Sequence, residues 1–139
     1  MRSPSILDFQ RQLIAASLDD FTPNATLSDF CGGQYGSEPD VWKSAVIDFL
    51  CTNLRYGLVE VTHRPDISAT RDITALKGLL LDGDVEKGLD SAVMWDALYF
   101  NGTKALIELI DRSGLHSWES LDRPENRELT ALLKKVYGT

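Results

Sequence analysis

The chain has 139 residues, of which 43% are hydrophobic and 25% are charged. This composition is typical of one folded domain with a hydrophobic core and excludes a disordered protein. The 21 acidic and 14 basic residues give a net charge of -7, which disfavours nucleic acid and anionic membranes as partners and favours a cationic one.

The cysteines and the N-terminal residues bear on the cellular compartment. Cys31 and Cys51 are too few for a small secreted domain that depends on disulfides. The first residues lack the apolar run of a signal peptide, and no stretch approaches the length of a transmembrane helix. We therefore expect a cytoplasmic protein without a membrane span.

The first third of the chain predicts one helix and one loop. Ser3-Pro4 is typical of a helix start, because serine caps helices and proline fits the first helical position. Apolar residues then recur at helical spacing to about Asp19. Residues 21–37 contain a proline and three glycines without a clear period, so we predict a loop with one short turn at Leu27–Phe30.

The clearest helical pattern follows this loop. Apolar residues from Trp42 to Leu54 lie at helical spacing. Ser37 and Asp40 fit a capping box at its start, and Gly57 fits its end. Residues 59–62 alternate and are rich in β-branched residues, which predicts a short strand.

The middle of the chain predicts two further helices. Pro65 is expected to close the strand, and a third helix is expected from about residues 68–70 to the break at Asp82-Gly83-Asp84. Residues 84–100 contain the most apolar stretch and predict a helix that is buried on more than one side. A buried strand over residues 92–100 is the alternative.

The last part of the chain predicts a turn and two more helices. Asn101-Gly102 indicates the turn, and Thr103 indicates the cap of a helix that ends at Gly114. Asp122 and Glu125 fit a capping box for the final helix. The fold class predicted for residues 1–139 is therefore mainly α, a single domain of five to six helices with one short β element.

Acidic residues are concentrated in residues 82–103, which contain five acidic residues and one basic residue, Lys87. An EF-hand loop is excluded, because Lys87 occupies the position that needs glycine and Val93 the position that needs glutamate. Acids beside large aromatic residues suit a binding surface for a cationic protein. The predicted partner-binding residues are Asp82, Asp84, Glu86, Asp90, Asp96, Trp95, Tyr99 and Trp118.

Asp96 also raises the question of catalysis. Its place in an apolar run puts it on the side expected to face the core, and a lone buried carboxylate is a functional candidate unless it is paired. Two histidines and two cysteines without close spacing do not suggest a zinc site, and no nucleophile or phosphate-binding motif is found. We therefore expect no enzyme, no metal and no cofactor.

The small size, the net acidity and the missing motifs together resemble the immunity proteins that bacteria make against their interbacterial toxins. The segment that carries the resemblance runs from Leu80 to Asp90 and on from Trp95 to Phe100. The resemblance implies a stoichiometric inhibitor in the cytosol, which covers a basic toxin with an acidic surface.

Two alternatives come from other classes of protein. Residues 42–61 resemble the helix-glycine-strand ending of a winged-helix DNA-binding regulator, and basic residues gather there, although the net charge opposes it. These basic residues are Arg55, His63, Arg64 and Arg71. A small enzyme that uses Asp96 or the carboxylates of residues 82–90 would need those groups to converge in a cleft.

Overall fold

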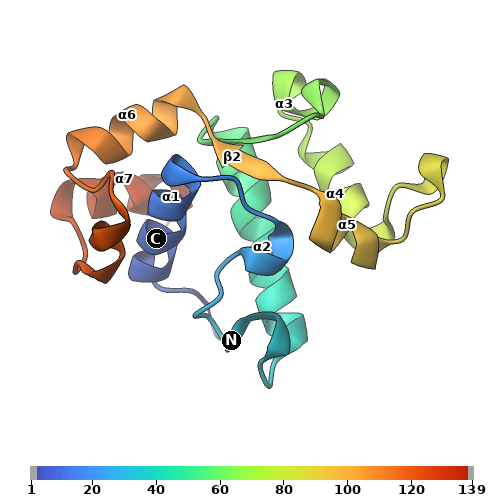
Figure 1. Cartoon of the computed structure of the whole chain (residues 1–139), viewed down its shortest axis with the longest axis horizontal. Helices are drawn as coiled ribbons and strands as arrows, with labels where there is room; N and C mark the ends of the chain where they lie inside the picture. Colours follow the sequence, from blue (N-terminus) through green and yellow to red (C-terminus); the bar gives the residue numbers. More distant parts are fainter. Residues whose placement is uncertain (1–2, 138–139) are drawn as a thin grey trace.

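Seven α-helices and a two-stranded antiparallel sheet form residues 3–137, which are the residues that the computed structural model describes (Figure 1). The helices are α1 (Ile6–Leu18), α2 (Pro39–Arg55), α3 (Pro65–Thr70), α4 (Ile73–Asp82), α5 (Ser91–Ala97), α6 (Lys104–Arg112) and α7 (Arg127–Tyr137). The strands are β1 (Val59–Val61) and β2 (Phe100–Gly102). The short 3₁₀ helices are η1 (Pro23–Ala25), η2 (Gly33–Tyr35), η3 (Val85–Lys87) and η4 (Trp118–Asp122). The predicted fold class, mainly α with a short β element, is confirmed.

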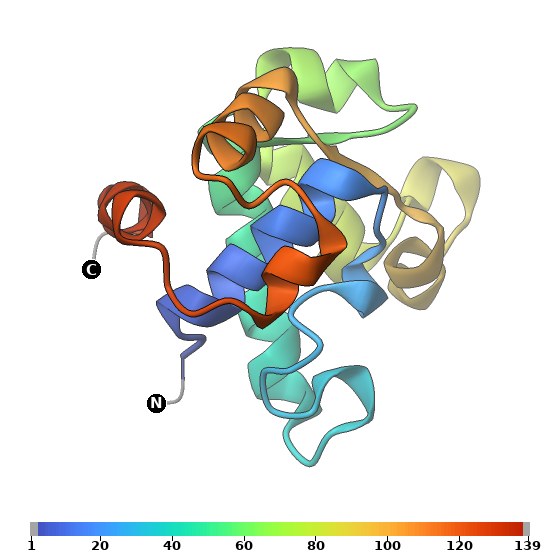
Figure 2. The ribbon, with the colours of Figure 1, turned by 60° about the vertical axis from the view of Figure 1, so that its left-hand side comes forward.

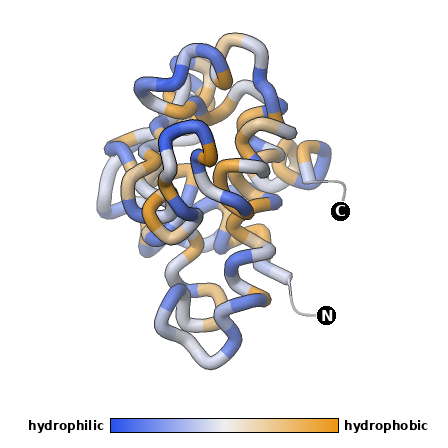
Figure 3. Tube along the Cα trace, turned by 90° about the vertical axis from the view of Figure 1, so that its right-hand side faces the viewer, coloured by the Kyte–Doolittle hydropathy of each residue, from blue (hydrophilic) through white to orange (hydrophobic). Residues whose placement is uncertain are grey.

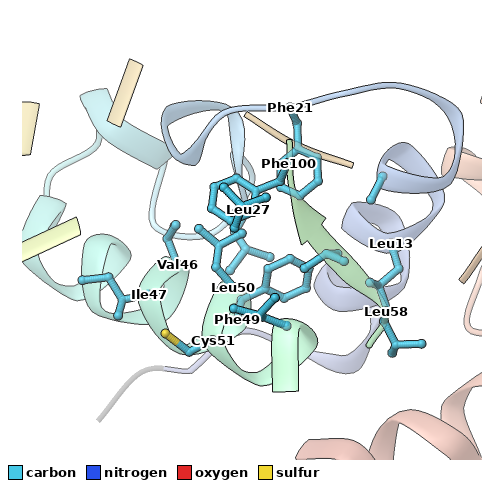
Figure 4. Packing of buried hydrophobic residues seen from close by; sticks show 14 of the residues in the cluster. Leu13, Phe21, Leu27, Val46, Ile47, Phe49, Leu50, Cys51, Leu58 and Phe100 are labelled. Atoms are coloured by element: carbon cyan, nitrogen blue, oxygen red, sulfur yellow. The ribbon is translucent and has the colours of Figure 1, made fainter. Parts of the chain in front are cut away.

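The core lies between α1, α2 and the sheet. Leu13 and Leu50 are completely buried, and the rings of Phe21 and Phe100 stack with centroids 5.8 Å apart (Figure 4). Burying side chains of this size is the main source of stability for a domain of this length. No helix within residues 3–137 is long and apolar enough to cross a membrane.

The helix with the clearest pattern, α2, ends as predicted. Gly57 adopts a φ of 71°, and its amide donates to the carbonyl of Leu54 at 3.1 Å. The amide of Leu58 donates to the carbonyl of Asn53 at 2.9 Å. These two bonds form a Schellman motif, which turns the chain directly into β1.

The partner of β1 was missed by the sequence analysis. Asn101 and Gly102 were predicted as a turn, but they lie in β2, where Gly102 pairs with Val59. A Cβ at Gly102 would lie 2.7 Å from the carbonyl oxygen of Ala16. The glycine is thus required by the close approach of α1 to the sheet, and not by a turn.

The starts of α1 and α2 differ from the prediction. Ser5 caps α1, because its side chain accepts from the Asp8 amide at 3.1 Å, so the predicted start at Ser3-Pro4 is two residues early. The predicted Ser37-Asp40 capping box is absent, since α2 begins after Glu38 without a side-chain cap bond.

The start of α7 is set by a tertiary contact. The side chain of Gln10 on α1 donates to the carbonyl of Pro124 at 3.0 Å and accepts from the amide of Asn126 at 2.9 Å. These bonds hold residues 124–126 outside the helix, and Asn126 then caps α7 through the Leu129 amide at 3.0 Å. The capping box predicted at Asp122 and Glu125 is therefore wrong.

The predicted third helix is two helices. Arg71 adopts a left-handed conformation with a φ of 52°, and Asp72 caps α4 by accepting from the amide of Ala75 at 2.9 Å. The hydroxyl of Ser68 bonds to both the amide and the carbonyl of Val61, at 2.9 and 3.0 Å. This contact fixes α3 against β1, so the chain has to turn before it can form α4.

Candidate functional site

The segment that joins α4 to α5 forms a tight protruding loop, which is the yellow loop at the right of Figure 1. Asp84 and Leu89 exchange backbone hydrogen bonds of 2.8 and 3.0 Å, and η3 lies between them. Gly83 has a φ of 84°, and a Cβ there would lie 2.2 Å from the carbonyl oxygen of Leu89. The loop therefore depends on glycine at this position. The single helix predicted for residues 84–100 is wrong, and so is the alternative strand over residues 92–100, because α5 occupies residues 91–97.

We call residues 81–93 the α4–α5 edge. Four of the nine large hydrophobic side chains that are exposed within residues 3–137 lie on it, and the most exposed of the four is Val85, at 78%. The others are Leu81, Leu89 and Val93. Asp82, Glu86, Lys87 and Asp90 are exposed between them, so hydrophobic and hydrophilic residues alternate along the edge, on the side of the molecule that faces the viewer in Figure 3. Exposed hydrophobic side chains gathered in one place are typical of a surface that binds another protein.

Asp84 does not belong to this exposed acidic set. It is 9% exposed, and its carboxylate lies 3.6 Å from Nη1 of Arg64. Arg64 also donates two hydrogen bonds of 3.2 Å to Asp66, and these bonds lower the pKa of Asp66. The predicted partner-binding role of Asp84 is therefore corrected to an internal one, which ties the loop to the start of α3. Asp90 has a structural role as well, because it caps α5 through the amide of Val93 at 3.0 Å.

Trp95 is a second correction. It is 4% exposed, its ring packs against Trp42 at 5.5 Å, and its indole N–H donates to the carbonyl of Leu80 at 2.9 Å. A partner cannot contact this ring while α5 is in place, so Trp95 supports the edge and does not belong to its surface. Tyr99 is 46% exposed, so its ring is accessible to a partner, as the prediction requires.

Asp96 was expected to face the core, and it is exposed. Because α5 begins only at Ser91, its inward residues are Met94 and Trp95, and Asp96 points away from them. Its carboxylate accepts a hydrogen bond from the side chain of Asn24 in η1. Asp96 is therefore a surface link between α5 and η1 and not a buried catalytic candidate.

Trp118 lies apart from the edge, on η4, and is 54% exposed. It lines a groove of about 340 Å³ between α1, residues 20–29 and η4. The lining carboxylates are Asp8, Asp19, Asp20 and Asp29. The sequence analysis missed these four residues, although Asp8, Gln12, Ala15 and Asp19 share one face of the predicted first helix.

The side chains that a metal site or a DNA-binding surface would need are not brought together in residues 3–137 in the way that such a site requires. Within residues 3–137, no three His, Cys, Asp or Glu side chains are placed to hold a metal ion. In the basic cluster of the winged-helix alternative, Arg64 is paired with acids, and Arg71 donates to the carbonyl of Arg55 at 3.3 Å. The sheet beside this cluster has two strands of three residues, and β2 packs onto α1.

Comparison of the chain with known protein families, proteins and structures finds no relative. No protein-family model, no curated protein and no solved structure matches the chain. Its function is therefore inferred from its own residues.

Proposed function

We propose that this chain binds a basic protein in a stoichiometric complex, and that the α4–α5 edge is the centre of the contact. One observation carries the proposal, which is the exposure of four large hydrophobic side chains with acidic residues between them. Apolar side chains supply the buried centre of an interface, and charges around them select the partner and speed its approach. The net charge of -7 favours a cationic partner at longer range.

The loop is also held in place before a partner arrives. The Asp84–Leu89 bonds, the Arg64–Asp84 ion pair and the Trp95 indole bond fix its two ends. Pre-organisation of this kind reduces the entropy lost on binding. The proposed biological role is that of an immunity protein, which keeps a basic toxin inactive in the cytoplasm.

The test compares matched variants in capture from the native lysate. Asp82→Lys and Glu86→Lys reverse two exposed charges of the edge, and Val85→Ser removes its most exposed apolar group. The control carries Asp111→Lys and Glu125→Lys, which make the same charge change at exposed positions on α6 and before α7, at the other end of the molecule (Figure 1). Asp90→Asn is a further variant, because asparagine keeps the cap of α5 and removes the charge.

We expect a basic protein that the wild type and the control retain and the edge variants lose. That protein, made separately, should bind at one to one, and its activity should be blocked at that ratio. Equal retention by the edge variants and the wild type would remove the edge from the proposal. Capture of duplex DNA, with an affinity that falls steeply with salt, would favour the winged-helix alternative.

A further inference from the structure

We propose that the groove beside Trp118 is a separate binding site for an arginine side chain on an extended segment of a polypeptide. The groove has an aromatic wall at Trp118 and carboxylates along its lining, and none of its lining residues belongs to the α4–α5 edge. A guanidinium group is planar and always charged, so it can stack on an indole ring and donate to carboxylates at the same time.

The walls of the groove are fixed to each other. Arg11 on α1 donates from Nε to the carbonyl of Leu121 at 3.1 Å, and Nε2 of His116 lies 3.1 Å from the carbonyl oxygen of Ser17. Figure 2 shows η4 lying across α1. Trp118 lies between the two attached residues along the chain, so η4 is held on both sides of it. The ring is therefore held at the groove instead of moving freely with a loop.

The opposite wall of the groove is also held in place, and the floor of the groove is apolar. The side chain of Gln12 accepts from the amide of Leu27 at 2.8 Å, which holds Leu27 at a φ of 51°. Leu27 and Phe21 are buried and belong to the apolar part of the lining. This floor suits the methylene stem of a long side chain whose head group stays near water.

The charges of the lining favour a cation. Four aspartates line the groove, and three of them, Asp19, Asp20 and Asp29, are exposed. Arg11 is the basic residue of the lining, and its Nε is already engaged by Leu121. Because no three carboxylates in residues 3–137 converge as a metal site would require, the arrangement favours an extended organic cation over a metal ion.

The test uses short peptides and the whole protein. The probe is acetyl-Gly-Arg-Gly-Arg-Gly-amide, and the control peptide has citrulline, the neutral isostere of arginine, at both positions. Binding is followed by the indole N–H signals in a ¹H–¹⁵N spectrum. The indoles of Trp42 and Trp95 are buried and donate to carbonyls, so Trp95 serves as the internal reference, while the exposed Trp118 should move. The variant Trp118→Phe assigns the signal.

We expect a saturable shift of the Trp118 signal with the arginine peptide and none with the citrulline peptide. Asp20→Asn with Asp29→Asn should weaken binding by about fivefold, while Asp111→Asn with Glu125→Gln should leave it unchanged. Raising the salt from about 50 to about 500 mM should weaken it further, because these carboxylates are exposed. Equal shifts with both peptides, no shift at all, or equal affinity in the two double variants would each overturn the inference.

Discussion

The substitution Trp95→Phe tests whether Trp95 supports the α4–α5 edge from inside. The last carbonyls of a helix lack partners within the helix, and Leu80 lies in the last turn of α4. The amide of Asp84, four residues further on, donates to Leu89 instead, and the carbonyl of Leu80 accepts from the Trp95 indole at 2.9 Å. Phenylalanine keeps most of the ring area and removes this donor.

The magnitude follows from burial. Leaving a buried acceptor without a partner costs about 1–3 kcal/mol. The smaller phenylalanine ring also buries less apolar area against Trp42, which costs about 1 kcal/mol. We therefore expect the free energy of unfolding to fall by roughly 2–4 kcal/mol, a large part of the total of about 5–15 kcal/mol that is typical of a domain.

Urea unfolding followed by far-ultraviolet circular dichroism measures this loss, and the midpoint should fall by roughly 1–2 M at an unchanged slope. Trp118→Phe is the matched control, because it makes the same change at a half-exposed ring and should shift stability by less than about 0.5 kcal/mol. Equal midpoints for the two variants would show that the Leu80 bond and the burial of Trp95 contribute little, and the reasoning would then be wrong.

Three smaller predictions concern the cap of α7, the partly buried Tyr137 and the buried thiol of Cys51. Asn126→Ala should lower stability by about 1 kcal/mol in the same unfolding assay, because Asn126 caps α7. Asp122→Ala should leave the stability unchanged. A larger loss of stability with Asp122→Ala than with Asn126→Ala would instead support the predicted capping box at Asp122. Burial raises the pKa of Tyr137 above its ordinary 10.0, so its contribution to stability is complete below about pH 10 and is lost at higher pH, as the unfolded chain ionises first. Tyr137→Phe should reduce the fall of the thermal midpoint above pH 10, and an unchanged pH profile would refute the assignment. Burial also raises the pKa of the Cys51 thiol, so iodoacetamide at about pH 8 should modify it at least about tenfold more slowly than in the urea-unfolded chain.

The elements that could be predicted from the sequence are those whose signals are local. The stripe from Trp42 to Leu54 and the glycine at 57 lie within one helix and its end, so α2 was predicted nearly to the residue. The strand β2 has no such signal. Phe100 is in a strand because it pairs with Val61 and bridges to Phe21, which are far away along the chain.

The candidate site could be predicted in part for the same reason. The acidic run at 82–90 is visible in the sequence, but the direction of each side chain depends on where α5 begins. Asp96 is directed inward if Leu89 and Phe100 are inward residues of the same helix, but both lie outside α5, whose buried residues are Met94 and Trp95. The groove at Trp118 was missed because its walls are more than 80 residues apart and meet through Arg11 and Leu121.

The segment η1 links α5, which begins within the α4–α5 edge, to the groove, and this affects how a partner could use the two surfaces. Asn24 bonds to Asp96 on α5, while Ala25, the next residue, lines the groove. A standard interface uses about 20–30 residues a side and about 800 Å², which is about a tenth of the 7770 Å² surface of this chain. The α4–α5 edge has 13 residues, so a tightly bound partner has to extend beyond it. If one protein covers the edge and reaches the groove, Glu86→Lys and Asp20→Asn should each weaken its binding, and their effects in free energy should add. If Asp20→Asn leaves the affinity of the captured protein unchanged but still weakens the arginine peptide, the groove serves a different polypeptide.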